Sequence, residues 1–210
     1  MKDIPMFTTE NGVASLFLQE IPYSGVARVK IQASEAPQAL LEECVGFCRA
    51  CGAESIHATG HSCLEDYPFV TAIWELCGEI GEETDAALFP AQAETVEKWR
   101  TIANERMQGV DNAAWLTEKS CQEFAQQGRA YFVHRDGKLL GIGLIGEASI
   151  ELVASVVPGA GADVVRALAS ILPEIPIHLT VASTNTRALR LYERLGFVKV
   201  KELSKWYKII

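Results

Sequence analysis

A short turn carries the first residues whose types could do chemistry, the glycines of PGAGAD at 158–163. A glycine-bearing turn at a helix start offers unpaired backbone N–H groups and the positive end of the helix dipole to a phosphate. Glycine also lets the backbone approach without a Cβ. The turn lacks the Lys-Ser/Thr of a P-loop and the third Gly of a dinucleotide fingerprint, and Asp163 adds a negative charge. Close packing of a strand and a helix would explain the same glycines.

A second segment, VASTNTRALRLYERLGF at 181–197, combines a helix start, an aromatic hydroxyl and a helix stop. Asn185 is of a type that caps helices, and Tyr192 follows two turns later on the same helix face. Gly196 ends the helix, and Phe197 returns the chain to the core. Tyr192 is therefore either a functional hydroxyl or a core aromatic whose hydroxyl lies at the edge of the core.

Hydrophobic periodicity predicts the elements that position these residues in the second half of the chain, in the order α-α-β-β-β-α-β-α-β. Pro90 suits the first turn of the first helix, and Asp136-Gly137 predicts a hairpin. The predicted helices are 90–104, 112–126, 163–171 and 185–195, and the predicted strands are 129–134, 139–145, 149–157, 175–182 and one from 197 onward.

The first half reads β-β-α-β-β. Its predicted elements are strands 13–19 and 26–32 joined by a turn at 22–25, a helix from 36 to a stop at Gly52, and strands 55–59 and 69–77. An acidic, turn-prone stretch at 78–85 then suggests two domains, 1–88 and 89–210. Residues 1–88 hold 4 Lys and Arg against 14 Asp and Glu, a balance of −10, whereas residues 89–210 have a balance of +2. The acidic half is either a solvated face or a surface that steers a cationic substrate.

The pattern N-x-x-A-x-x-L-Y-x-x-L-G-F, which begins at Asn185 and follows a strand, resembles the acyl-CoA-binding end of the GNAT acetyltransferase superfamily. The element order of residues 90–210 matches that fold along its length. The resemblance implies a mixed α/β (α+β) fold with a mostly antiparallel central sheet. A hairpin, helix, Gly stop and strand recur at 13–59 and 129–182, so the first half is interpreted as a partial, degenerate GNAT-like copy; two unrelated α/β pieces are the alternative.

The resemblance also implies a cofactor site for acetyl-CoA, used as co-substrate without a metal. In the family, the strand assigned here to 149–157 parts from its neighbour and pairs with the pantetheine arm. The family's pyrophosphate loop, Arg/Gln-x-x-Gly-x-Gly/Ala, falls on Pro158, Gly161 and Asp163, of which only Gly161 fits fully. The implied cofactor-binding residues are Leu152, Val153, Ala154, Gly159, Ala160, Gly161 and Asn185.

Two residues receive catalytic roles from the resemblance. Tyr192 corresponds to the tyrosine whose hydroxyl protonates the departing CoA thiolate, a role that a positioned phenol can fill. Glu151 is the candidate general base that takes a proton from the substrate ammonium; its alternative is a solvent-facing strand residue. Basic residues near the expected phosphate site fit either phosphate binding or a solvated helix face, and they are Arg166, Arg187 and Arg190.

The cysteines suggest a different kind of site. A C-x-x-C at 48–51 precedes His57, His61 and Cys63, and zinc prefers Cys and His ligands. The sequence lacks the second tight pair of a zinc knuckle. The alternative is one apolar helix face, made of Leu40, Cys44, Phe47, Cys48 and Cys51, on which free Cys packs as a small apolar group.

Composition bounds the function class. The chain has 210 residues, 49% hydrophobic and 22% charged, no apolar run of membrane-spanning length, and no export signal at its start. With six unpaired cysteines expected, we predict a cytoplasmic protein. A net charge of −8 argues against nucleic-acid binding. The expected activity is transfer of an acetyl group from acetyl-CoA to a small-molecule or peptide amine by direct attack, with no membrane partner and a homodimer as candidate assembly. The alternative is a GNAT-fold acyl-CoA-binding or regulatory module with little catalysis.

Overall fold

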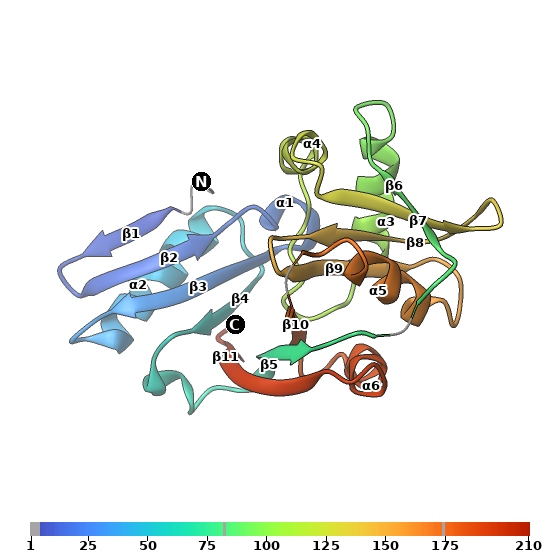
Figure 1. The fold of residues 1–210 in the computed structure, drawn as a ribbon. Coiled ribbons are helices and arrows are strands. Elements are labelled where there is room, and N and C mark those ends of the chain that lie inside the picture. Colours follow the sequence, from blue (N-terminus) through green and yellow to red (C-terminus); the bar gives the residue numbers. More distant parts are fainter. Residues whose placement is uncertain (1–4, 82, 174) are drawn as a thin grey trace. The chain divides into compact units, whose positions relative to one another are not determined.

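The computed structural model describes residues 5–81, 83–173 and 175–210 (Figure 1). Residues 1–4, which belong to the start examined for an export signal, and residue 82 of the acidic stretch lie outside the described residues. Contacts divide the chain into unit 1, residues 1–72 and 203–210, and unit 2, residues 73–202. The chain therefore passes between the units twice, in strands β5 (Phe69–Gly78) and β11 (Val198–Lys208). The boundary expected at 88/89 falls on β6 (Ala87–Pro90), inside unit 2.

In unit 1, a three-stranded antiparallel sheet leads through a helix into a parallel strand. The elements are β1 (Met6–Thr9), β2 (Gly12–Phe17), α1 (Ile21–Ser24), β3 (Val26–Ala33), α2 (Pro37–Ala50), β4 (Ser55–Thr59) and a 3-10 turn, η1 (Ser62–Leu64). β3 and β4 pair in parallel over five positions, from Val26 with Ser55 to Lys30 with Thr59. The end of β11 pairs antiparallel with β4. The helix α2 begins at Pro37, and Gly52 ends its turn with a φ of +92°.

In unit 2, the order of three antiparallel strands, a helix and a parallel strand recurs, preceded by a strand and two helices. The elements after β6 are α3 (Val96–Met107), α4 (Glu118–Gln126), β7 (Ala130–Arg135), β8 (Lys138–Ile145), β9 (Ser149–Ser155), α5 (Gly161–Ala169), β10 (Ile177–Ala182) and α6 (Thr186–Arg194). Strands β6 to β9 pair antiparallel with their neighbours, β9 and β10 pair in parallel across α5, and β5 pairs antiparallel with β10. Because β3–β4 and β9–β10 are parallel, the pairing is mixed rather than purely antiparallel.

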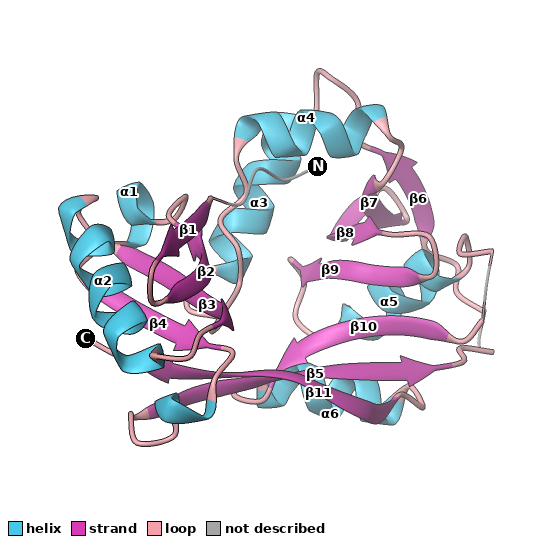
Figure 2. Ribbon diagram, turned by 90° about the vertical axis from the view of Figure 1, so that its left-hand side faces the viewer, coloured by secondary structure: helices cyan, strands magenta, loops and turns pink. Residues whose placement is uncertain are grey.

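Helices cover both faces of the unit 2 sheet (Figure 2). Trp99 of α3 and Phe124 of α4 pack with Ile142 of β8 on one face. Val164 and Leu168 of α5 pack on the other face in a separate core cluster. Alternating side chains of β7, β8 and β9 supply the two clusters, as expected for strands that are buried on both sides.

Two local predictions differ from the structure, and one strand was not predicted. Pro90 does not begin a helix. It ends β6, the edge strand of the sheet, where a residue without an N–H can be placed without loss of a hydrogen bond between strands. The helix predicted from 90 begins at Val96 instead. The turn at 22–25 includes one helical turn, α1, and strand β1 was not predicted.

The helix predicted over 112–126 begins only at Glu118. The side chain of Asn104 donates to the carbonyl of Leu116 (3.0 Å) and accepts from its N–H (2.9 Å), which holds the preceding segment as a loop. Asn112 has a left-handed φ of 61°, and Thr117 forms a capping box with Ser120. The two bonds from Asn104 of α3 satisfy backbone groups of Leu116 that a longer helix would have satisfied itself.

None of the helices in the described ranges combines the length and the apolar character that a membrane span needs.

Candidate functional site

Strands β9 and β10 part soon after they begin. They pair at only two positions, Ser149 with His178 and Ile150 with Leu179, although β9 continues to Ser155 and β10 to Ala182 (Figure 2). On its other side β9 stays paired with β8 as far as Ser155. The backbone of β9 beyond Ile150 therefore has an edge that β10 does not occupy.

A β-bulge lies where the strands part. The register of β8 against β9 shifts between Leu144 and Ile145, which leaves Glu151 as the extra residue of β9. An extra residue bends a strand and turns it away from its neighbour. The equivalent strands of unit 1, β3 and β4, pair at five consecutive positions without a shift. The register of β2 against β3 in unit 1 also shifts, between Val13 and Ala14, so among the described strands the early parting of the parallel pair, and not a bulge alone, distinguishes unit 2 from unit 1.

A cleft of about 330 Å³ lies beside the free edge of β9. Strand β9, the glycine turn and helices α3 and α6 all contribute to it. Its lining residues are Arg106, Met107, Val110, Val153, Ala154, Ser155, Gly159, Gly161, Asn185, Arg187, Ala188, Leu191, Tyr192 and Arg194. Six of the predicted site residues meet here: Val153, Ala154, Gly159, Gly161, Asn185 and Tyr192. Within the described chain, the lining set does not include Glu151, Leu152 or Ala160.

The glycine turn places the N-terminus of α5 at the cleft. Gly159 has a left-handed φ of +86°, and Ala160 caps α5 without a side-chain hydrogen bond. A Cβ on Gly161 would lie 2.9 Å from Leu191 Cδ2, so this glycine allows α5 and α6 to approach closely. The first backbone N–H groups of a helix have no partner within it. The turn therefore presents N–H groups and a helix dipole next to the open edge of β9.

Asp163, whose charge opposes an anion here, is neutralised by two arginines. Its carboxylate lies 3.1 Å from Arg135 Nη1 and 3.8 Å from Arg166 Nη1. The Asp163 carboxylate is the main cause of a raised pKa at Arg135. Because Arg135 comes from the β7–β8 hairpin, this compensation could not be recognised from the turn itself.

Tyr192 is 7% exposed and lines the cleft. Its ring packs edge-on against Phe197, with ring centroids 5.9 Å apart. Among the described residues its hydroxyl has no hydrogen-bond partner, and burial raises its pKa to about 12. Asn185 caps α6 by accepting from the N–H of Ala188 at 3.1 Å, as predicted. Tyr192 is thus both a core aromatic and a protonated hydroxyl at the cleft.

Glu151, the predicted base, forms an ion pair. Its Oε1 lies 2.6 Å from Arg129 Nη2, and Arg129 also donates to the carbonyl of Ile145 at 2.8 Å. The base role of Glu151 stays a prediction, with its carboxylate engaged by a cation.

A second acid–base pair was missed from the sequence. His178 Nδ1 lies 3.1 Å from Glu75 Oε1, across the β5–β10 pairing. Leu179, beside His178, belongs to the core cluster that contains α5, so His178 projects from the opposite sheet face. His178 is also one of the two residues of β10 that still pair with β9. Because the partners lie 103 positions apart, no local pattern could indicate this pair.

Part of the apolar-face interpretation is confirmed, because Leu40, Cys44 and Cys48 are buried, whereas Phe47 and Cys51, predicted for the same face, are exposed. Cys44 and Cys48 are buried in α2, and burial raises the pKa of Cys44 to about 12 and that of Cys48 to about 11. Within residues 5–81, 83–173 and 175–210, no group of three or more His, Cys, Asp or Glu side chains is placed to hold a metal ion.

Solved structures with the same fold include several GNAT proteins. A GCN5-related N-acetyltransferase from Kribbella flavida superposes with a TM-score of 0.61 at 15% identity, covering 98% of this chain and 88% of that one. A GNAT-family acetyltransferase from Colwellia psychrerythraea gives 0.56 at 12% identity, with coverage of 97% and 84%. A tandem GNAT protein from the clavulanic acid biosynthesis pathway gives 0.55 at 14% identity, with coverage of 94% and 78%.

No protein-family model and no curated protein sequence matches the chain. At such low identity the structural likeness concerns the fold. The chain has the mixed α+β fold of GNAT acetyltransferases, as the motif at 185–197 predicted.

Proposed function

We propose that unit 2 is an acyl-CoA-dependent N-acetyltransferase that transfers an acetyl group from acetyl-CoA to an amine by direct attack. The observation that carries this proposal is the parting of β9 from β10 after two paired positions, beside the N-terminus of α5. A strand edge with unpaired peptide groups suits the amide-bearing pantetheine arm, and helical N–H groups suit the diphosphate. The fold shared with GNAT acetyltransferases supports the same activity.

In the proposed reaction, a neutral amine forms a C–N bond to the acetyl carbonyl and the C–S bond to CoA breaks. A base takes one proton from the attacking nitrogen, and the sulfur leaves as a thiolate. Backbone N–H groups of the β9 edge stabilise the charge that develops on the carbonyl oxygen. The proposed base is Glu151, and His178, oriented by Glu75, is the second candidate because its imidazole is not held by an arginine.

Tyr192 would act on the leaving sulfur. With its pKa raised to about 12, its hydroxyl remains protonated at neutral pH and is available as a donor. A free thiol has a pKa of about 8.5, so its thiolate is a weaker base than the buried phenolate. We therefore propose that Tyr192 stabilises the departing thiolate mainly by a hydrogen bond, with complete proton transfer being unfavourable in this buried setting.

The acceptor is proposed to be a small-molecule or peptide amine with a cationic character. The support is charge alone: the chain carries −8, and residues 1–88 carry −10. Opposite charge raises the local concentration of a cationic substrate and speeds its association. A cytoplasmic location and a homodimer are further proposals, which rest on the sequence and not on this charge argument.

Two measurements test the activity separately. Titration calorimetry with acetyl-CoA measures binding, and a thiol reagent measures CoA release over a panel of polyamines, aminoglycosides and lysine peptides. We expect binding, and release with at least one cationic amine. Binding without release across the panel would favour the alternative, a GNAT-fold module that binds acyl-CoA without catalysis. Failure to bind acetyl-CoA would contradict both functions.

A matched pair of variants connects the result to the cleft. Tyr192→Phe keeps the ring that packs on Phe197 and removes only the hydroxyl, so it should bind acetyl-CoA normally and release CoA more slowly. Tyr131→Phe removes a hydroxyl from β7, outside the lining residues, and should leave both measurements unchanged.

A further inference from the structure

A second cavity lies at the edge of the unit 2 sheet. Its volume is about 300 Å³, and it is formed by strand β6 and the β7–β8 hairpin. Among the described residues, none lines both this cavity and the cleft beside β9. The side chains that line it include Asp85, Phe89, His134, Arg135 and Asp136. We call this cavity the hairpin pocket.

One wall of the hairpin pocket is aromatic. Phe89 is 52% exposed, and its ring stands edge-on to the imidazole of His134, with ring centroids 5.2 Å apart. The Nδ1 atom of His134 is buried and has no hydrogen-bond partner within the described chain. Buried polar atoms are normally hydrogen-bonded, so an unpaired one at a cavity wall points to a role beyond packing. An exposed aromatic ring attracts cations to its face.

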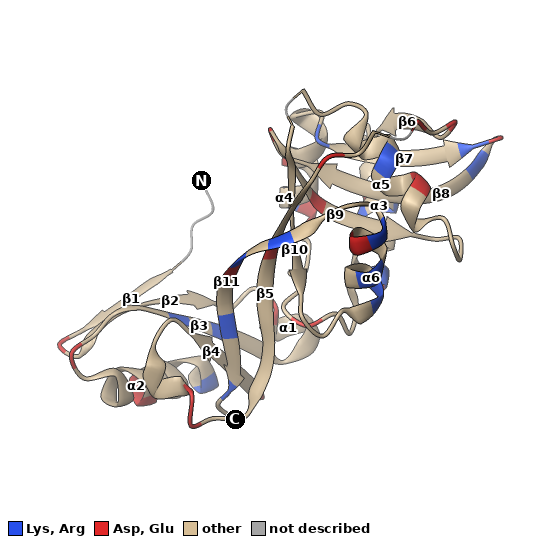
Figure 3. Cartoon of the chain, turned by 60° about the horizontal axis from the view of Figure 1, so that its bottom comes forward, with Lys and Arg blue, Asp and Glu red and all other residues tan. Residues whose placement is uncertain are grey.

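Two carboxylates make the rim of the hairpin pocket acidic. Asp136 is exposed at the tip of the hairpin, where Figure 3 shows red between two blue segments. Within the described ranges, the Asp136 carboxylate forms no hydrogen bond or ion pair. The side chain of Asp85 is 74% exposed, and its carboxylate lies 3.4 Å from Arg135 Nη1.

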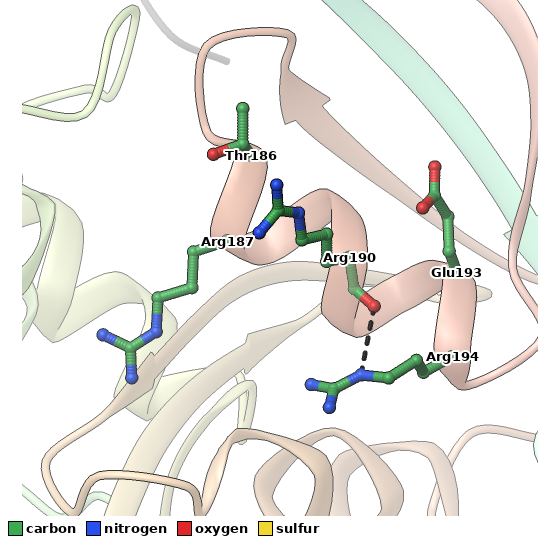
Figure 4. Close-up of a pocket in the computed structure, with 5 residues that line it drawn as sticks. All are labelled: Thr186, Arg187, Arg190, Glu193 and Arg194. Carbon is green, nitrogen blue, oxygen red and sulfur yellow. Dashed lines mark hydrogen bonds between the residues drawn. The ribbon is translucent and has the colours of Figure 1, made fainter.

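The basic side chains without a carboxylate partner on α6 lie elsewhere. Figure 4 shows them extending from α6, and in the part of the chain that the structure describes they form no ion pair; they are Arg187, Arg190 and Arg194. They line other hollows and not the hairpin pocket. A cationic ligand would therefore meet, at Asp136, a carboxylate with which no described basic side chain forms an ion pair.

Arg135 connects the hairpin pocket to the glycine turn. Its Nη1 lies 3.4 Å from the Asp85 carboxylate and 3.1 Å from that of Asp163, so one nitrogen is shared between the pocket and the first turn of α5. A cation that binds Asp85 leaves this nitrogen to Asp163 alone. The negative potential at the start of α5 then falls, and the charge of the bound cation lowers it further.

We propose that the hairpin pocket binds a small organic cation, an ammonium group attached to an aromatic or aliphatic body, and that this ligand raises the affinity of the glycine turn for CoA. The ammonium group lies between Asp85 and Asp136, and the body packs on Phe89. The effect on CoA rests on the proposed function, whereas the pocket itself does not. Because coupling between two sites is reciprocal, CoA raises the affinity for the cation by the same factor.

An NMR titration of the full chain with benzyltrimethylammonium tests the pocket. This probe cannot be acetylated, and benzyl alcohol is its neutral control. We expect the cation, and not the alcohol, to shift the amide signals of Phe89 and Gly137. No shift at these residues, or equal binding of the alcohol, would overturn the inference.

Three variants locate the bound probe. Phe89→Leu keeps an apolar side chain on β6 and removes the ring, so it should weaken binding by about threefold or more. Asp136→Asn should also weaken binding, because it removes the rim charge. Glu123→Gln, which removes an exposed carboxylate from α4, is the control and should bind the probe as the wild type does. Equal binding by all three variants would place the probe outside the pocket and overturn the inference.

Titration calorimetry with CoA, in the presence and absence of saturating probe, tests the coupling. We expect CoA to bind about fivefold more tightly with the probe present. Asp85→Asn removes the carboxylate that competes for Arg135, so it should raise the affinity for CoA without any probe, whereas Glu123→Gln should not. An affinity for CoA that neither the probe nor Asp85→Asn changes would overturn the coupling. A protein that binds the probe but not CoA would contradict the proposed function and with it the coupling, while the pocket itself would be confirmed.

Discussion

The burial of Tyr192 gives a quantitative prediction about stability at high pH. The pKa of this phenol is about 12 in the folded protein and about 10 for an exposed tyrosine. Because the folded state holds the proton more strongly, the associated stability is fully present below pH 10 and is lost as the pH rises to 12. At pH 11 the loss is on the order of 1 kcal/mol, and above pH 12 it approaches about 3 kcal/mol.

The substitution Tyr192→Phe isolates the contribution of this phenol to the pH dependence of the free energy of unfolding. The hydroxyl has no hydrogen-bond partner among the described residues, so we expect the variant to match the wild type within about 0.5 kcal/mol at pH 8. At pH 11 the variant should be more stable than the wild type by about 1 kcal/mol. Buried thiols such as Cys44 and Cys48 also titrate in this range, but they are common to both proteins and cancel in the difference.

Urea unfolding followed by circular dichroism at pH 8 and pH 11 measures both differences. Absorbance near 295 nm, which reports phenolate, should show one tyrosine of the wild type titrating late and the same step missing in Tyr192→Phe. An equal loss of stability in the two proteins between pH 8 and pH 11 would refute the reasoning, because Tyr192 would then titrate like an exposed phenol. The cleft would in that case be more open to water than its packing indicates.

Two further predictions concern the sheet and the proposed base. A Cβ at Gly141 would lie 2.5 Å from the backbone oxygen of Ala154, so Gly141→Ala should destabilise the protein by about 1–3 kcal/mol in urea unfolding. The control Gly46→Ala, in an open position of α2, should stabilise it by about 0.5–1 kcal/mol, and similar effects of both variants would contradict the packing argument. If Glu151 is the base, Glu151→Gln should slow CoA release by about 100-fold or more, while His178→Gln leaves the rate of release nearly unchanged. The opposite pattern would assign the base to His178.

Much of the local structure was encoded in short segments. The helix α6, its Asn185 cap and the stop at Gly196 follow from residue types within one stretch, as do α2 and the β7–β8 hairpin. Periodicity reports which side of an element faces the core, and caps report where it ends, because both depend on neighbouring residues. The same information indicated the GNAT fold, and it singled out Asn185, Tyr192 and the glycine turn, which the structure places at one cleft.

Only the tertiary structure decided how that cleft is opened and charged. The parting of β9 from β10 is a matter of strand register, and the neutralisation of Asp163 needs Arg135 from a distant hairpin. Likewise, the loop before α4 depends on Asn104, and β5 and β11 each contribute to both units. These features arise from contacts between residues far apart in the chain. Patterns within short segments give no information about such contacts, because the free energy of each contact depends on which segments the folded chain brings together.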